Sequence, residues 1–255
     1  MFIPQKICDG VEMSDKPAAQ RRAEALFREK KYEEALEVYR GLHADLKEDK
    51  YLYNVAVCLY HLSQVGDAAA ILEQLWSRRA LAPDSGVFLG FCHRSLNQLG
   101  RGRQHFEAMI AETSGQVRGR CRLMVALLTD ELGETDRAES LYEQLLTDVE
   151  TGGKDRAEVY RRLATLKENR KDHLKALQLY RESLTQDPEG EGALAAKFRM
   201  AVCLMELSAP AESVDLLKDI ETAVPGTFLG ESAAKLRQAV ESNVRRIERN
   251  IRSYE

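Results

Sequence analysis

Small side chains recur in pairs along this chain, and the second member of each pair lies twelve positions after the first. The first members are Ala23, Ala56, Gly90, Ala126, Ala164 and Ala201. The second members are Ala35, Ala68, Gly102, Ala138, Ala176 and Ser213. The pairs follow one another at intervals of 33, 34, 36, 38 and 37 residues. Because small residues let two successive helices approach closely, this pattern predicts six helical hairpins built from one repeated unit.

A large apolar side chain follows every second small residue by four positions. These side chains belong to Tyr39, Leu72, Phe106, Tyr142, Tyr180 and Leu217. Residues four apart lie on one face of a helix, so each pair is expected to pack into the same interface. The composition favours an all-α fold, because helix formers recur throughout and the chain has only 16 Gly and 6 Pro.

The pattern resembles the tetratricopeptide repeat family, which shares the two small residues, the following aromatic residue and a proline near the end of the unit. The third repeat carries the family's Leu-Gly pair as Leu89-Gly90, and Pro188 and Pro225 occupy the proline position of the fifth and sixth repeats. The resemblance implies a right-handed α-solenoid over residues 16–228. Its six hairpins are expected at about 16–48, 49–82, 83–118, 119–156, 157–193 and 194–228. The extra residues of the longer repeats are expected in loops at 151–153 and 189–192.

The two ends of the chain differ from the repeats. Residues 1–15 lack helical periodicity and are predicted to form a flexible tail. Apolar residues then recur every three or four positions near the C-terminus, which predicts one continuous helix over 229–255. This helix allows two interpretations: it caps the last hairpin, or its last turns pair with another chain. The residues that would form such a pairing are Val244, Ile247, Ile251 and Tyr254.

The resemblance also implies a place for a partner, because the first helices of tetratricopeptide hairpins line a concave groove. The family's groove positions fall on Tyr53, Val57, Tyr60, His61, Val87, Phe91, Arg94, Leu123, Leu127, Asp130, Arg161, Phe198 and Val202. The set is largely apolar and aromatic in repeats two to four, which predicts a bound peptide or protein segment with apolar anchors. The N-terminal tail and a sister chain remain alternative occupants.

Charge is unevenly distributed along the repeats. Residues 76–125 contain eight Arg and three acidic residues, whereas residues 126–160 contain ten acidic and three basic residues. This contrast fits either an ordinary solvated helix surface or a polar groove that orients a charged peptide. A net charge of −4 and the acidic neighbour argue against a nucleic-acid partner.

Motifs that support chemistry are not found in the sequence. Cys58, Cys92 and Cys203 each follow a first small residue by two positions, where other repeats have Ala or Leu, so they are predicted to be core residues. No set of four zinc ligands, catalytic triad or phosphate-binding glycine loop is present. The glycines at 100, 102, 115 and 119 are expected at hairpin turns. We therefore expect no enzymatic activity, cofactor or metal.

These observations predict a non-catalytic scaffold or adaptor that binds a protein or peptide in the groove. A secretion or assembly chaperone and a peptide-responsive regulator remain as alternatives. The sequence has no apolar stretch near the ~20 residues of a membrane span and no apolar core of a secretory signal near Met1. Five cysteines without paired spacing favour reduced thiols, so a cytoplasmic location is expected.

Overall fold

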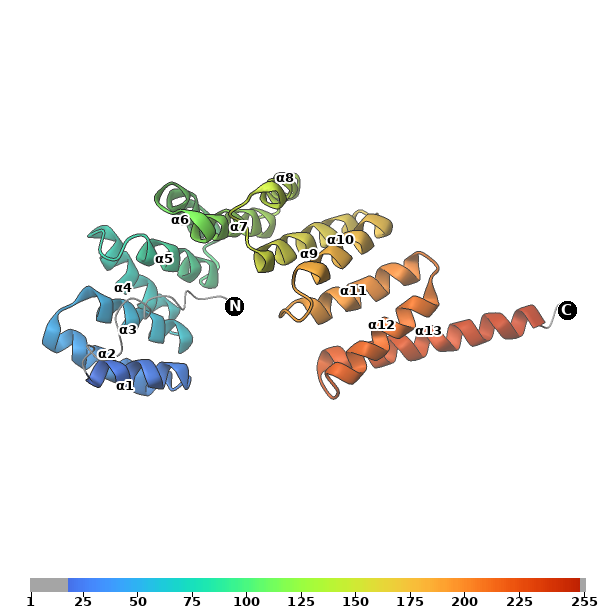
Figure 1. Cartoon of the computed structure of the whole chain (residues 1–255), viewed down its shortest axis with the longest axis horizontal. Helices are drawn as coiled ribbons and strands as arrows, with labels where there is room; N and C mark the ends of the chain where they lie inside the picture. The colour runs from blue at the N-terminus through green and yellow to red at the C-terminus, as the bar shows by residue number, and fades with distance from the viewer. Residues whose placement is uncertain (1–17, 253–255) are drawn as a thin grey trace. The chain divides into compact units, whose positions relative to one another are not determined.

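The structure is a computed structural model that describes residues 18–252, and the side chains of Glu248 and of residues 250–252 lie outside that description. The described residues form thirteen α-helices and no β-strand (Figure 1). Their bounds are Ala18–Arg28 (α1), Tyr32–Leu46 (α2), Asp49–His61 (α3), Val65–Ser77 (α4), Asp84–Ser95 (α5), Leu99–Glu112 (α6), Gly115–Glu131 (α7), Thr135–Thr147 (α8), Gly153–Asn169 (α9), His173–Gln186 (α10), Ala193–Glu206 (α11), Pro210–Ala223 (α12) and Phe228–Arg252 (α13). The predicted all-α hairpin fold is confirmed. The predicted tail at residues 1–15 lies outside the described residues.

The chain divides into two compact units, Met1–Gly133 and Glu134–Glu255. In the first unit each helix from α1 to α7 packs against the next helix in the chain. In the second unit the helices from α8 to α13 pack in the same sequential way. Packing of each element against its neighbours in sequence is typical of helical repeat proteins.

The longer repeats extend helices as well as loops. The predicted loop at 189–192 falls between α10 and α11, and residues 151–152 fall between α8 and α9, whereas Gly153 is the first residue of α9. However, α7 and α9 each contain 17 residues, and each begins four residues before the expected start of its repeat. Part of the additional length therefore lies in the first helices of these two hairpins.

All twelve small residues are buried, as their spacing predicts. A methyl group on Gly90 would lie 2.8 Å from the Phe106 ring, and one on Gly102 would lie 3.3 Å from the Gly90 carbonyl oxygen. In the sixth hairpin the Ser213 hydroxyl donates a hydrogen bond to the Ala201 carbonyl oxygen at 3.0 Å. In the third and sixth hairpins the paired small residues thus face each other, as predicted.

The large side chains four positions later are buried as well. Each of the six is at most 3% exposed, from Tyr39 in the first hairpin to Leu217 in the sixth. Cys58, Cys92 and Cys203 are fully buried, so their predicted place in the core is confirmed.

The turns inside the hairpins share one backbone feature. The residue seven positions after each first small residue has a positive φ, and these residues are Lys30, Ser63, Asn97, Gly133, Lys171 and Ser208. Glycine, which adopts this conformation most easily, occupies only one of the six turns. The expectation that Gly100, Gly102 and Gly119 lie at turns is wrong, because they lie inside α6 and α7. In α6, close helix packing rather than a turn requires Gly102.

The last helix covers the sixth hairpin. Its Ala233 is fully buried in a cluster with Ala201, Leu217 and Ile220 of α11 and α12. Val240, two turns further along α13, is 4% exposed. The first half of α13 therefore caps the apolar surface of the second unit.

Candidate partner-binding surface and a cavity between hairpins

Six of the thirteen predicted groove residues are buried within the first unit. They are Tyr53, Val57, Tyr60, Val87, Leu123 and Leu127, and each is at most 8% exposed. The Tyr60 hydroxyl hydrogen-bonds with the Ser95 hydroxyl at 2.8 Å, and its ring lies 5.2 Å from the Phe88 ring. Tyr53, Val57 and Tyr60 belong to a buried cluster that also contains Phe88 and Leu89 of α5. Whether the six residues also contact a partner stays a prediction.

His61 lies between the first two hairpins. Its ring stacks on Tyr32 at 4.4 Å between ring centres and meets the edge of Phe27 at 5.3 Å. Burial lowers the pKa of His61, because the charged imidazolium loses hydration in this aromatic setting. A half-buried aromatic cluster therefore forms the N-terminal end of the predicted groove.

Phe91 and Arg94 present partly exposed surface on α5. The Phe91 ring packs edge-on against Phe106 at 5.1 Å between ring centres and remains half-buried. Two nitrogens of the Arg94 guanidinium donate to the Glu131 carboxylate of α7, one of them at 3.3 Å. Asp130, next to Glu131, is also half-buried. The first unit thus places an aromatic ring beside a charged pair on its first helices.

The other three predicted groove residues belong to the second unit. Phe198 is half-buried and packs against the cluster under α13, while Val202 is half-buried on the same helix. Arg161 is half-buried on α9 and forms an ion pair with Glu158. Burial lowers the pKa of the Arg161 guanidinium, with a further lowering by its neighbour Arg162.

A buried carboxylate that the repeat pattern does not indicate connects three helices of the second unit. Glu168 accepts hydrogen bonds from the Tyr180 hydroxyl at 3.0 Å and from Arg199 Nε at 2.9 Å. The Tyr180 hydroxyl also lies 3.1 Å from the Thr165 hydroxyl. Burial, first among several causes, raises the pKa of Tyr180 to about 12. Sequence spacing places these residues on α9, α10 and α11 but does not reveal that they meet.

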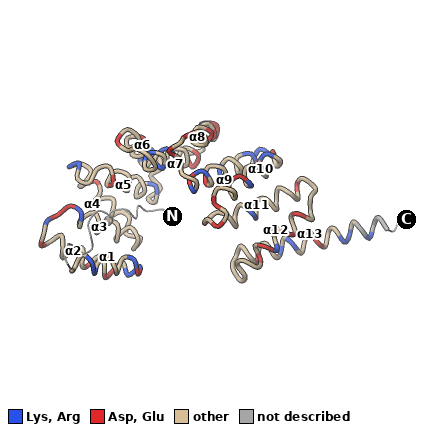
Figure 2. Tube along the Cα trace, viewed as in Figure 1, with Lys and Arg blue, Asp and Glu red and all other residues tan. Residues whose placement is uncertain are grey.

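Four of the eight arginines of the basic segment pair with carboxylates of the described residues. Figure 2 shows the change from blue positions in α5 to α7 of the first unit to red positions in α8 of the second unit. Arg78 pairs with Asp49, Arg79 with Glu112, and Arg103 with Glu107, in addition to the Arg94 pair with Glu131. These pairs neutralise much of the positive charge that the sequence indicates for residues 76–125.

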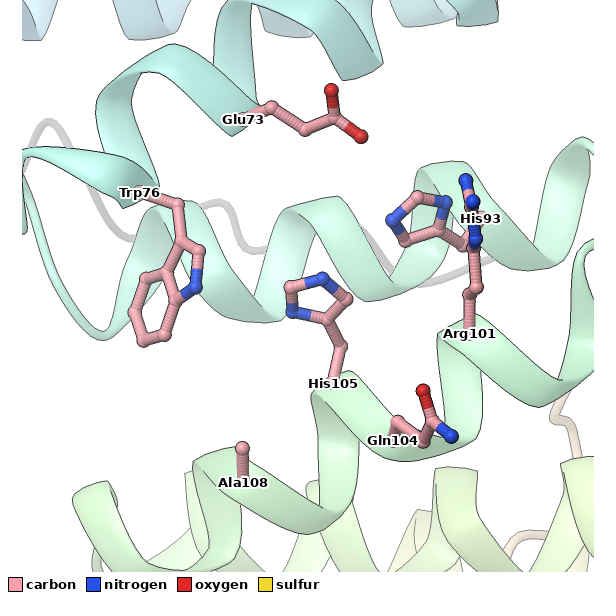
Figure 3. A pocket seen from close by; sticks show the side chains of 7 residues that line it. All are labelled: Glu73, Trp76, His93, Arg101, Gln104, His105 and Ala108. Carbon is pink, nitrogen blue, oxygen red and sulfur yellow. The ribbon is translucent and has the colours of Figure 1, made fainter.

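A cavity of about 460 Å³ lies between the second and third hairpins of the first unit. Side chains from α4, α5 and α6 line it: Glu73, Trp76, His93, Arg101, Gln104, His105 and Ala108 (Figure 3). His93 is 4% exposed, and its Nδ1 hydrogen-bonds with Gln98 Oε1 at 2.8 Å. The His93 and His105 rings stack at 5.1 Å, and burial followed by the proximity of His93 lowers the pKa of His105.

The repeat pattern does not predict this cavity, because the family's groove positions lie on first helices whereas most of the lining comes from the second helices α4 and α6. Two signals pointed toward it. Trp76 is the only tryptophan of the chain, and His93 and His105 are twelve positions apart, the spacing that brings the helices of a hairpin together.

Thiol and metal chemistry find little support in the described part of the chain. Burial raises the pKa of Cys58 and of Cys92 to about 12, so both remain protonated near neutral pH. Among residues 18–252, no group of three or more His, Cys, Asp and Glu side chains is arranged to hold a metal ion. Within the same range, no helix combines the length and the low charge that crossing a membrane requires.

The residues expected to pair with another chain lie in the second half of α13. Val244 is half-buried, and Ile247 is 56% exposed. The side chain of Ile251 and all of Tyr254 lie outside the described residues. A pairing through this helix stays a prediction.

Comparison with known proteins identifies the repeated unit. Residues 125–193 match the model of the tetratricopeptide repeat family. The apo form of the quorum sensor NprR from B. thuringiensis has a similar fold, with a TM-score of 0.70 and 13% identity over 86% of this chain and 68% of that chain. PilF from Pseudomonas aeruginosa has a TM-score of 0.67 and 12% identity over 84% of this chain and 94% of its own.

A third similar structure is an assembly chaperone of RpL4, with a TM-score of 0.58 and 16% identity over 92% of this chain and 98% of that chain. At these identities the likeness shows a common fold. A comparison with curated protein sequences gave no significant match.

Proposed function

Because this chain is a tetratricopeptide repeat protein, we propose that it is a non-catalytic scaffold that binds a peptide or protein segment along the first helices of its hairpins. One observation carries the proposal: half-buried aromatic and charged side chains lie on the same helices as the buried apolar residues of α3, α5 and α7 in the first unit. Phe91 and the Arg94–Glu131 pair form the centre of this surface.

The chemistry of this surface favours a segment that carries both an apolar anchor and a charge. The exposed part of the Phe91 ring offers apolar contact, and aromatic residues and arginine are enriched among the residues that dominate binding energies. Glu131 holds the Arg94 guanidinium, so a partner carboxylate would join an existing charged pair rather than a lone cation. A cytoplasmic protein or peptide partner fits these requirements, and no nucleic acid is needed to explain them.

Two similar structures favour the two alternative roles equally. One is named as a quorum sensor and another as an assembly chaperone. The second would suit a chaperone that shields an apolar client segment, and the first would suit a regulator that responds to a ligand. Both roles require the repeats to bind another molecule, and this binding is the function that a scaffold shares with them.

Selection of peptides against the purified chain tests the proposal even though the partner is unidentified. A random-peptide display library is selected on the wild-type protein, and the dissociation constants of the enriched peptides are measured by fluorescence anisotropy. The variant Phe91→Ala with Arg94→Gln should weaken their binding by about tenfold or more, because it removes the central anchor and its neighbouring charge.

The control variant is Glu37→Gln with Arg40→Gln, an exposed ion pair on α2. It changes charges outside the proposed surface and should leave the dissociation constants unchanged. Circular dichroism melts establish that both variants are folded. Enriched peptides that bind the Phe91 and Arg94 variant as tightly as the wild type would place the binding surface elsewhere and refute the proposal.

A further inference from the structure

The cavity between α4, α5 and α6 has an aromatic end and a charged end. Trp76 lies at one end and faces Ala108, whereas Glu73 and Arg101 lie toward the other end (Figure 3). The His105 ring lies between them and meets the Trp76 ring edge-on at 6.3 Å between ring centres. A ligand that spans the cavity would therefore touch an aromatic wall and two opposite charges.

The aromatic end is held in place by its surroundings. The Arg79 guanidinium lies 4.6 Å over the Trp76 ring, and Glu112 binds that guanidinium through hydrogen bonds of 3.0 and 2.6 Å. The indole also packs against the backbone at Gly86, where a methyl group would lie 2.8 Å from Trp76. The indole therefore presents a fixed edge to the cavity, and Ala108 leaves space beside it.

The charged end is unusual because its side chains make no hydrogen bond or ion pair with the described residues. Four of the eight arginines in residues 76–125 form ion pairs with described residues and three more take part in other interactions, whereas Arg101 makes no hydrogen bond or ion pair with the described residues. Glu73 and Gln104 also form no hydrogen bond or ion pair with the described residues, although the Glu73 charge acts on the His105 imidazole. Two opposite charges thus line one cavity and, in the described chain, do not pair with each other.

We propose that this cavity binds a free aromatic α-amino acid. Its carboxylate would bind the Arg101 guanidinium, whose planar fork matches a carboxylate. Its ammonium group would bind the Glu73 carboxylate, and its ring would pack against Trp76 and His105. A volume of about 460 Å³ lies within the range of small-ligand sites. The cavity presents two opposite charges and an aromatic wall, and the ammonium group, carboxylate and ring of an aromatic amino acid complement all three.

This inference does not depend on the proposed peptide-binding surface, because it uses the second helices α4 and α6 and none of the predicted groove residues. Its failure would leave the scaffold function untouched, and failure of the scaffold function would leave the cavity unchanged.

Trp76 supplies a direct readout, because it is the only tryptophan in the chain. L-phenylalanine is titrated into the intact protein while Trp76 fluorescence is recorded, and isothermal titration calorimetry measures the same binding independently. We expect saturable binding in both measurements. N-acetyl-L-phenylalanine lacks the ammonium group and L-phenylalaninamide lacks the carboxylate, so each should bind about tenfold or more weakly.

Charge-neutral variants separate the two ends of the ligand. Arg101→Gln should weaken L-phenylalanine binding by about tenfold or more but have little further effect on the amide, which lacks the carboxylate. Glu73→Gln should likewise weaken L-phenylalanine binding by about tenfold or more. It should have little further effect on N-acetyl-L-phenylalanine, which lacks the ammonium group. Arg40→Gln and Glu37→Gln on α2 are the matched controls and should bind as the wild type does.

Because Arg101 and Glu73 are exposed and make no ion pair with the described residues, both variants should remain folded, which circular dichroism verifies. Absence of calorimetric binding by the wild-type protein would overturn the proposal. Equal binding of L-phenylalanine, its amide and its N-acetyl derivative would also overturn it, because the two charges would then play no part.

Discussion

At the scale of single residues, the third hairpin shows why its small sites are glycine. Most of the equivalent sites in the other hairpins are alanine, whereas Gly90 and Gly102 face each other here. The Phe106 ring fills the space above Gly90 so closely that even a methyl group would overlap it. The apparent departure of Gly102 from the repeat pattern is therefore a consequence of how closely α5 and α6 approach.

Gly90→Ala should lower the free energy of unfolding by about 1–3 kcal/mol, because the added methyl group forces the Phe106 ring to move within a packed core. Gly41→Ala is the matched control, since Gly41 lies within α2 with nothing within 4 Å of the added methyl group. It should raise the free energy of unfolding by about 0.5–1 kcal/mol through helix propensity. Urea unfolding followed by circular dichroism measures both values, and equal stabilisation by the two changes would contradict the close approach.

For single residues, the sequence predicts the small packing sites but not the accessibility of the groove positions. The twelve small sites could be predicted because their spacing records the geometry of one hairpin. The accessibility of the groove positions could not, because it depends on side chains from other hairpins. Tyr60 is buried by Phe88 and bound to Ser95, both on the next hairpin. Similarly, Arg101 forms no ion pair with an acidic side chain of the described residues. The spacing of residues along the sequence cannot show that such a partner is missing.

At the scale of elements, the hairpin turns depend on one residue in the left-handed conformation. Five of the six turns place Lys, Ser or Asn there, with φ between 57° and 63°. The chain then reverses through backbone hydrogen bonds, as in the 2.9 Å bond from the Gln64 amide to the Leu59 carbonyl oxygen. Residues other than glycine are strained in this conformation, so these turns lower the stability of the folded chain. The periodicity of the helices does not show this loss of stability.

Ser63→Gly should therefore raise the free energy of unfolding by about 1 kcal/mol, since glycine adopts a φ of 63° without a Cβ penalty. Ser242→Gly, at an exposed position inside α13, should lower it by a similar amount because glycine weakens a helix interior. Chemical denaturation of the two variants should show these opposite changes in the free energy of unfolding. Destabilisation by Ser63→Gly would show that the serine side chain contributes more than the strain removes.

Helix contacts in the second unit predict a specific sensitivity to acid. Glu139 of α8 binds Lys167 and Arg170 of α9, with Arg170 Nη1 at 2.6 Å. The hydrogen bond from Lys167 and then that from Arg170 hold the pKa of Glu139 below its usual 4.5, against the opposing effect of burial. A depressed pKa contributes stability that is present above pH 4.5 and is lost as the pH falls through the lower value in the folded protein.

Glu139→Gln should reduce stability near pH 7 and flatten the loss of stability below pH 4.5, because the variant has no carboxylate left to protonate. Urea midpoints measured between neutral and acidic pH provide the comparison. Glu143→Gln, an exposed residue on the same helix, is the control and should retain the wild-type pH profile. A Glu139→Gln profile parallel to that of the wild type would show that this carboxylate contributes no acid sensitivity.

At the scale of the whole molecule, sequential packing makes the terminal helix important for stability. In a helical repeat protein each hairpin is stabilised mainly by its neighbours, so a terminal hairpin needs a cover on its outer apolar surface. Here α13 provides that cover through Ala233 and Val240, and Arg237 fixes it to α12 through a 2.9 Å hydrogen bond to Glu221. The sequence predicted this helix because its apolar periodicity continues beyond the last hairpin.

Deletion of residues 228–255 should selectively destabilise the second unit. Leu217 and Ile220 are fully buried, and the deletion exposes them on one side. Complete loss of burial of two such side chains corresponds to about 3–6 kcal/mol, so exposure on one side should lower the stability of the second unit by part of that amount. Hydrogen exchange with mass spectrometry should show lost protection in α11 and α12, whereas α1 to α5 in the first unit should keep theirs because they contain none of the affected contacts.

A shorter deletion, of residues 248–255, separates the cap from the end of the helix. It retains Ala233, Arg237 and Val240 and begins after Ile247, which is 56% exposed. Protection of α11 and α12 should therefore match that of the full chain, because the contacts that seal the sixth hairpin remain. Equal loss of protection in the two deletions would show that the last turns stabilise the unit. If α12 instead stayed protected after the longer deletion, the sixth hairpin would be stable without α13 and the capping role would be wrong.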